Sequence, residues 1–403
     1  MTEVSETTSL RLAAFERYWH RVNHHRAAGL AVLDLGMGMP TPALLPFSHK
    51  LERELHRAIE SGDYLRYGPA AGSKQFITAV LELENSRLPV SVTPYTSANV
   101  SQTPGAIAAF ALLTELLLPR NAIVSLVHPS YFTLWARCEQ RMKPHALHLR
   151  DARLSDEHLT RLIPEKTRAV VLTQPNNPTG RYHSTEALEA LIEWCEARRV
   201  WLIMDETCNC FPLGQPAALP VNIRSGSVLR VQSFSKSLNL SGVRAGYLIA
   251  AAGVVERFAS AVPPMHGNSP LVADKAVVRL LTSETLNART VCFTEQIAYF
   301  SRALRKLPEV AEVVEPEACY YVYARFGREW SSDKLCARLL DEQSLDVVPG
   351  SLFGEADGEC WLRFCIARPM TTLRDAVERL TRMFQSAPPS LPKSSEPSKP
   401  KGK

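Results

Sequence analysis

The stretch "VQSFSKSLNLSGVRAGYLIA", residues 231–250, sets a lysine and an arginine among serines, glycines and apolar residues. Lys236 directly follows a run that is typical of a buried strand, and Arg244 comes eight positions later. A lysine amine in such a place can act as a nucleophile when burial or a nearby cation lowers its pKa. Ser233, Ser235 and Arg244 flank it closely enough to bind a phosphate together, and the planar guanidinium fork suits that anion. The segment therefore predicts a site for a phosphorylated ligand.

Strand and helix patterns alternate along the chain around this segment. Runs of apolar and β-branched residues predict buried strands at 122–127, 168–173, 200–204, 227–233 and 245–250. Residues 184–199 have a helical pattern in which Ser184 is a candidate N-cap and Glu186 places a carboxylate in the first turn. This alternation predicts an α/β protein with a largely parallel sheet.

Polar side chains follow three of these strands. Asn177, within "QPNNPTG", comes after the second strand, Asp205 after the third, and Lys236 after the fourth. Ligands of open α/β sheets bind beyond the carboxyl ends of the strands, so these three groups should meet at one edge. An amide, a carboxylate and an amine gathered there predict a site for a small polar cofactor.

Pyridoxal phosphate is a cofactor whose requirements this chain can meet. It forms a Schiff base with a lysine, and it needs a carboxylate against its ring nitrogen, an anion cradle and a flat partner for its ring. Asp205 is a candidate for keeping the ring nitrogen protonated. Gly105 and Ala106, in "SQTPGAIAAF", begin a predicted helix whose free backbone N–H groups favour an anion. Tyr131, in "VHPSYFTLW", is the candidate for stacking on the ring.

Taken together, these motifs resemble the fold-type I pyridoxal-phosphate enzymes of the class I/II aminotransferase family over roughly residues 30–385. They occur in family order: "LGMGMPTP", "YGPAAG", "TPGA", "PSY", "NNPTG", "DE", "SFSKSLNLSGVRAGY", "VPGSLFG" and "LRFCIA". The resemblance implies a mostly parallel, seven-stranded sheet flanked by helices, together with a smaller α+β domain.

The resemblance also implies a role for several residues. Lys236 would be the lysine of the internal aldimine, and Asn177 would hydrogen-bond the phenolic oxygen of the cofactor. Arg363 would hold the α-carboxylate of the substrate, with Gly38 close by. Tyr67, in "YGPAAG", would reach the cofactor phosphate of a second subunit, which implies a homodimer with shared active sites.

The implied activity is transfer of an α-amino group from an amino acid to a keto acid. One departure leaves an alternative open, because the chain reads "DETC", with Cys208 where many aminotransferases have a tyrosine. Elimination, replacement, cyclisation or oxidation of an amino acid in specialised metabolism would use the same fold. Arg257 faintly resembles an arginine that binds a second substrate carboxylate across subunits, but a helix-surface arginine explains it more simply.

Two other functions known for this fold fit the sequence less well. A transcriptional regulator of this fold would need a DNA-binding domain, and about thirty residues precede "LDLGMGMP". An acyl-CoA-condensing synthase usually has a histidine near the aspartate, which "DETC" lacks. Considered alone, each site residue could be an ordinary surface charge, helix cap, turn residue or packed aromatic. The cofactor site is favoured because all the motifs occur together and in family order.

Composition and targeting patterns indicate which partners and which location to expect. The 403 residues carry a net charge of +5, but four lysines lie in the last fifteen residues, so nothing points to nucleic acid. No signal, transit or membrane-spanning pattern is present, and nine scattered cysteines match no metal motif, which favours a cytoplasmic protein. Four parts are expected along the chain. Residues 1–47 form an N-terminal arm with part of the small domain, and residues 48–285 form a large cofactor-binding domain. Residues 286–385 form a small α+β domain, and residues 386–403 a disordered tail.

Overall fold

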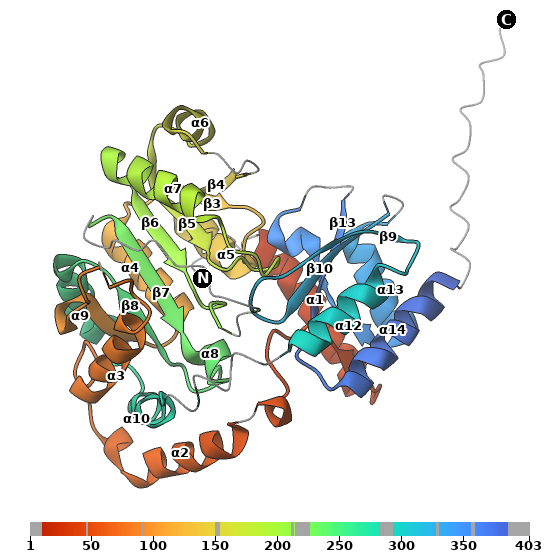
Figure 1. The fold of residues 1–403 in the computed structure, drawn as a ribbon, viewed down its shortest axis with the longest axis horizontal. Helices are drawn as coiled ribbons and strands as arrows, with labels where there is room; N and C mark the ends of the chain where they lie inside the picture. Colours follow the sequence, from red (N-terminus) through yellow and green to blue (C-terminus); the bar gives the residue numbers. More distant parts are fainter. Residues whose placement is uncertain are drawn as a thin grey trace, which may run out of the picture.

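The protein, seen here as a computed structural model, consists of a large sheet covered by helices and a smaller sheet beside it (Figure 1). The structure describes residues 10–45, 47–90, 92–149, 154–210, 213, 226–282, 285, 293–327, 330–355 and 359–385. The tail predicted at 386–403 lies outside them. Within the described residues, no helix combines the length and the apolarity needed to cross a bilayer.

The large sheet has seven strands in the order β2-β8-β7-β6-β5-β3-β4. Their bounds are β2 Val100–Thr103, β3 Ile123–Val127, β4 Lys143–Leu147, β5 Thr167–Thr173, β6 Trp201–Asp205, β7 Val228–Ser233 and β8 Gly246–Ile249. Neighbours from β7 to β4 pair in parallel, whereas β8 is antiparallel to both β7 and β2. The predicted α/β class, the mostly parallel seven-stranded sheet and the five predicted strands are confirmed.

Helices cover both faces of this sheet because its central strands are apolar on both faces. Val170 and Leu172 of β5 pack in one apolar cluster, whereas Ala169 and Val171 pack in another. The first cluster includes α3 Lys74–Asn85, α6 Asp156–Leu162, α7 Thr185–Arg198 and α10 Leu271–Leu280, and the second α4 Ala106–Leu117, α5 Phe132–Arg141 and α9 Ala252–His266. The N-cap of α7 is as predicted, since Ser184 Oγ accepts the Ala187 N–H at 3.1 Å.

The smaller unit is built on an antiparallel sheet in the order β12-β13-β10-β9. Its elements are β9 Val310–Val314, β10 Tyr321–Phe326, β12 Val348–Pro349, η5 Gly350–Phe353, β13 Cys360–Cys365, α12 Thr294–Leu304, α13 Ser332–Gln343 and α14 Met370–Gln385. The β segment predicted at "CYYVYARF" and that at "CWLRFCIA" are thus adjacent strands. The predicted domain limits themselves remain a prediction, and residues 286–292 lie outside the described part.

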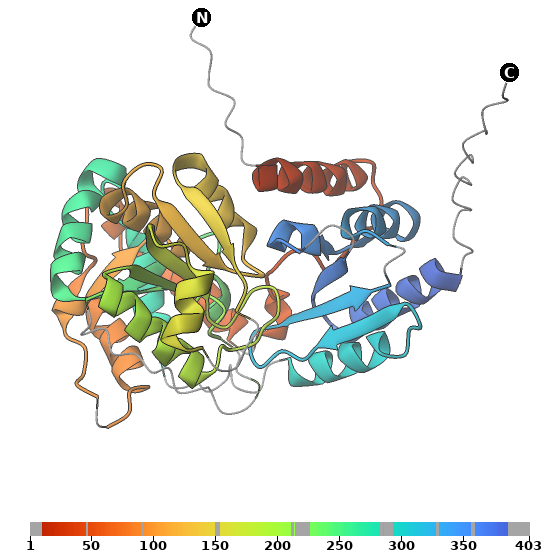
Figure 2. The ribbon, with the colours of Figure 1, turned by 90° about the horizontal axis from the view of Figure 1, so that it is seen from above.

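The N-terminal segment contacts this smaller unit and also α5 of the large one. Helix α1 (Leu10–Ala27) lies along it in Figure 2, and β1 (Leu33–Asp34) pairs in parallel with β11 (Leu345–Asp346). After β1 the chain crosses to the large sheet, through η1 Pro42–Leu44, α2 Ser48–Glu60, η2 Asp63–Leu65 and, before β2, η3 Ser97–Asn99. The segment at 35–40 therefore runs between the two units.

Candidate active site

A cavity of about 340 Å³ lies where the large sheet meets the smaller unit. Residues at the carboxyl ends of three parallel strands line it, namely Thr173 of β5, Asp205 of β6 and Ser233 of β7. Ten of the predicted site residues are among its lining: Gly38, Ala106, Tyr131, Asn177, Asp205, Ser233, Ser235, Lys236, Arg244 and Arg363. The predicted meeting of polar groups at one sheet edge is therefore observed in the structure.

Lys236 lies in the short helix α8 (Phe234–Ser237), immediately after β7. Its Nζ donates a hydrogen bond to the carbonyl oxygen of Gly38, which comes from the segment between the two units. Burial lowers the pKa of the Lys236 amine below its usual value. The amine is therefore held in one position and is more easily made neutral, which a nucleophile or a general base requires.

Asp205 and Glu206 follow β6 together but have different environments. Asp205 is only 7% exposed, lines the cavity, and accepts the backbone N–H of Thr207 at 2.9 Å. Burial raises the pKa of Asp205, and it makes no ion pair within the described part of the chain. Glu206 instead forms a buried ion pair with Arg230, with an Nη2–Oε2 distance of 2.7 Å. Asp205 is thus the carboxylate left to balance a positive group in the cavity.

The groups predicted to bind a phosphate lie together. Gly105 is the N-cap of α4 with φ of 88°, and a Cβ built on it would come within 2.5 Å of Arg244 Nη2. Arg244 Nη1 donates to the carbonyl oxygen of Ser241 at 2.7 Å and to Ser235 Oγ at 3.4 Å. Ser233 Oγ donates to Ser235 Oγ at 2.8 Å. A helix N-terminus, a guanidinium and two hydroxyls thus form a cradle with the right donors for a phosphate.

Arg363 enters the cavity from β13 of the smaller unit. It donates from Nη2 to the carbonyl oxygen of Gly36 at 2.8 Å and from Nη1 to Asn177 Oδ1 at 3.2 Å. Its guanidinium carbon lies 4.5 Å from the centre of the Tyr321 ring, and its buried Nε has no hydrogen-bond partner. The guanidinium is therefore fixed in direction and keeps donor capacity for an anionic ligand.

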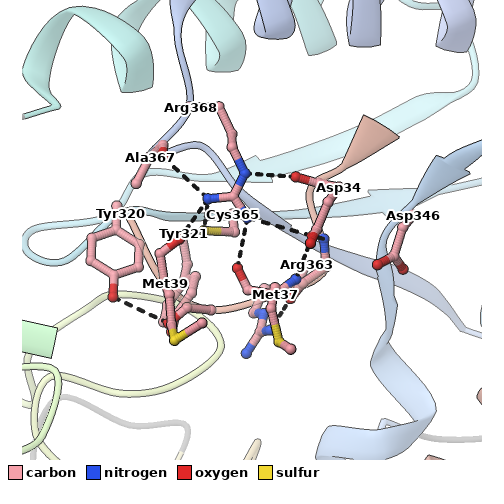
Figure 3. Close-up of polar contacts among 12 residues, drawn as sticks. Asp34, Met37, Met39, Tyr320, Tyr321, Asp346, Arg363, Cys365, Ala367 and Arg368 are labelled. Carbon is pink, nitrogen blue, oxygen red and sulfur yellow. Dashed lines mark hydrogen bonds and ion pairs between the residues drawn. The ribbon is translucent and has the colours of Figure 1, made fainter. Parts of the chain in front are cut away.

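Arg368 is a site residue that the sequence analysis missed. It binds the segment that carries Gly38, donating to the carbonyl oxygens of Asp34, Met37 and Met39 at 2.7, 3.0 and 2.6 Å (Figure 3). These bonds hold the segment in place against Arg363 and Lys236. No sequence signal distinguished Arg368 from other arginines near the C-terminus.

Helix α1 supplies further residues that the sequence analysis missed. Phe15, Tyr18 and Trp19 line the cavity from this helix. Their spacing of three and four positions places aromatic side chains on one face, and this pattern was present in the sequence. Phe132, at the start of α5, also lines the cavity, next to the predicted Tyr131.

Two expected residues need separate comment. Tyr67 does not line the cavity and is 88% exposed, so its predicted contact with a second subunit stays a prediction. Cys208 lines the cavity but is buried, and its hydrogen bond with Cys319 together with burial raises the pKa of its thiol. A thiol that stays protonated is a poor nucleophile, so Cys208 acts as a small apolar group there.

Asp346 is a buried carboxylate beside Arg363. Its Oδ1 accepts a hydrogen bond from the Tyr18 hydroxyl at 2.6 Å, whereas its buried Oδ2 has no hydrogen-bond partner. Burial raises its pKa from 3.8 to about 7; nearby Asp34 also raises it, whereas the Tyr18 hydrogen bond, Arg26 and Arg363 oppose the rise. The folded protein therefore holds this proton more tightly than the unfolded chain does.

This difference predicts a pH-dependent stability. The contribution of Asp346 is fully present below pH 3.8 and is lost as the pH rises through about 7. The Asp346→Asn variant cannot ionise, so its thermal unfolding midpoint should rise relative to wild type between about pH 5 and about pH 8. Asp375→Asn is the control: a hydrogen bond from Arg379 lowers the pKa of Asp375, so its difference from wild type should stay constant. A constant difference for Asp346→Asn would contradict the argument.

Comparisons with known proteins agree with this geometry. The profile of the family "Aminotransferase class I and II" matches residues 31–380. An aspartate aminotransferase of Pyrococcus horikoshii is 25% identical over 88% of this chain and 91% of its own length. A probable aspartate/prephenate aminotransferase of Aquifex aeolicus is 26% identical over 89% and 93%. The crystal structure of an aminotransferase from Mycobacterium tuberculosis superposes with a TM-score of 0.83 at 19% identity, covering 96% of this chain and 100% of that one.

Proposed function

The chain belongs to the class I and II aminotransferase family and is a pyridoxal-phosphate-dependent enzyme, and we propose that it transfers the α-amino group of an amino acid to a keto acid through Lys236. The observation that carries the proposal is the meeting of Lys236, Asp205 and Arg363 in one cavity. The relatives named as aminotransferases favour transamination over elimination, replacement, cyclisation or oxidation.

The residues present fit the cofactor. Asp205 would pair with the ring nitrogen, and Tyr131 would stack on the ring, as proposed from the sequence. Asn177 would hydrogen-bond the phenolic oxygen. The cradle of Gly105, Ala106, Ser233, Ser235 and Arg244 would bind the phosphate. When bound, pyridoxal phosphate supplies a ring that withdraws electrons from the α-carbon of the substrate.

The chain's own groups then position the substrate and move a proton. The guanidinium of Arg363 binds the substrate α-carboxylate and orients the α-carbon toward Lys236. Lys236 Nζ takes the proton from that carbon, and its lowered pKa suits this role because a larger fraction of the amine is neutral. The carbonyl oxygen of Gly38 holds Nζ near the place where the substrate enters.

Arg363→Leu tests the proposed carboxylate contact. Loss of a buried charged partner costs about 2–5 kcal/mol, so kcat/KM for amino acids should fall by about 30-fold or more, mainly through KM. For the corresponding amine, which lacks the carboxylate, kcat/KM should fall far less. Equal losses for the amino acid and its amine in steady-state assays would contradict the assigned contact. Arg325→Leu, in β10 of the same sheet, is the control.

A substrate screen tests the function as a whole. Purified holoenzyme would be incubated with the standard amino acids and a panel of keto acids, and the products identified by mass spectrometry. Formation of the matching keto acid together with a new amino acid supports transamination. Release of ammonia without a new amino acid would contradict it and favour elimination.

The proposal also includes a homodimer in the cytoplasm. Support for the dimer comes from the exposed Tyr67, which the family resemblance assigns to the cofactor phosphate of a second subunit. Twofold homodimers are also the commonest soluble oligomers. For the location, the support is that the cysteines of the described residues are free thiols, as is usual in a reducing compartment.

A further inference from the structure

The cations that line the cavity already have partners or proposed roles. They are Lys236, Arg244 and Arg363. Arg244 lies on the phosphate side with Ser235, and Arg363 is the proposed contact of the α-carboxylate. No further lysine or arginine of the described residues lines the cavity. A substrate with a second carboxylate would therefore bury a charge for which the described residues supply no partner, and such burial is costly.

The wall next to Arg363 is apolar instead. Val348 of β12 is the direct cross-strand partner of Arg363, and it packs in one cluster with Phe132 and Phe15. The ring of Phe15 stacks on that of Phe132, with centroids 4.5 Å apart and planes 24° apart. Phe15 and Trp19 are nearly parallel, at 6.4 Å and 9°. An apolar surface thus extends along the cavity from the proposed carboxylate contact to α1.

The same surface reaches the side of the cavity proposed for the cofactor ring. Phe132 follows Tyr131, and the two rings meet edge to face with centroids 5.0 Å apart. A side chain that leaves the α-carbon between Lys236 and Arg363 would therefore meet aromatic rings. Ring pairs add about 0.5–1.5 kcal/mol to the gain from burial, so a planar aromatic group gains most from this wall.

The polar group on this side of the cavity is already engaged. Tyr18 lines the cavity and its hydroxyl donates to Asp346, and Asp346 itself is not among the lining residues. Among the residues that the structure describes, this wall therefore presents no free carboxylate for a cationic side chain. This observation favours an aromatic substrate over lysine or arginine.

We propose that the substrate of this enzyme is an amino acid with an aromatic side chain, and that Phe15 and Trp19 of α1, with Phe132, determine this preference. The proposal rests on the transamination proposed above. It assigns to the N-terminal helix a role in specificity.

Kinetics with Trp19 variants test the proposal. Wild-type holoenzyme should prefer phenylalanine, tyrosine or tryptophan to aspartate by about 100-fold or more in kcat/KM. Trp19→Ala should lower kcat/KM for the preferred aromatic substrate by about 10-fold or more, mainly through KM. The same variant should keep kcat/KM for alanine within about twofold of wild type, because the methyl group of alanine is too short to reach α1. Trp19→Phe should restore most of the loss. Trp330→Ala, which removes an aromatic ring that packs on Phe384, is the matched control.

A binding measurement separates this proposal from the proposed function. Calorimetry of the holoenzyme should show tighter binding of 3-phenylpropionate than of succinate, and Trp19→Ala should reduce that difference. This result supports an aromatic pocket even if no amino acid is transaminated, in which case the proposed function alone fails. Preferred turnover of lysine or arginine would overturn the proposal, as would equal losses for alanine and phenylalanine in Trp19→Ala. Preferred turnover of aspartate that is lost in Arg257→Ala would also overturn it, by showing a cation from a second subunit.

Discussion

Lys236→Ala is expected to lower kcat by about 10⁴-fold with the preferred amino acid. The variant loses the amine that Gly38 holds in the cavity and whose pKa burial lowers. No other lysine lines the cavity among the described residues, so no nearby amine can take over the proton transfer. Single-turnover measurements with saturating cofactor would separate this loss from weaker cofactor binding.

Two controls make the result specific. Lys143→Ala changes an exposed lysine in β4 and should retain wild-type activity. Addition of a small primary amine such as methylamine should partly restore Lys236→Ala, because a diffusible base can enter the space of the missing side chain. Activity within about tenfold of wild type for Lys236→Ala would contradict the role of general base.

Asp205→Asn is expected to lower kcat/KM by about 10³-fold. Its carboxylate is buried and lacks an ion-pair partner in the described structure, and burial raises its pKa. A protonated ring nitrogen beside it would restore the charged carboxylate, and the carboxylate would in turn stabilise the positive nitrogen. The amide of asparagine has the same shape but no charge, so it removes this stabilisation without leaving a cavity.

Asp156→Asn provides the control for Asp205→Asn. Asp156 is an exposed aspartate at the start of α6, bonded to Arg198, and its loss should leave kcat/KM unchanged. Dialysis should also show weaker cofactor retention in Asp205→Asn than in this control. Wild-type kcat/KM and retention in Asp205→Asn would show that the carboxylate does not pair with the ring nitrogen.

Much of the large sheet could be predicted from the sequence because its strands are short apolar runs separated by helical patterns. The same pattern could not give the strand order or the antiparallel direction of β8, since both depend on contacts distant in sequence. Glu206 is an example of a site contact that the sequence could not predict. It adjoins Asp205 in the chain, but its ion pair with Arg230 is visible only once β6 and β7 lie side by side.

The contribution of the N-terminal helix was also beyond the sequence analysis. Tyr18 meets Asp346 across 328 positions, and no local pattern announces such a contact. The spacing of Phe15, Tyr18 and Trp19 does indicate one aromatic face. It does not tell whether that face packs in the core or lines a cavity. The contacts of Arg368 were equally unpredictable, because its four hydrogen bonds to main-chain oxygens are not indicated by composition or spacing.

Borohydride reduction of the holoenzyme, followed by proteolysis and mass spectrometry of the labelled peptide, tests directly whether Lys236 holds the cofactor. The vitamin B6 derivative should become fixed to Lys236, within the peptide that contains "SFSKSLNL". A label on another lysine, or a protein that takes up no pyridoxal phosphate, would contradict this expectation.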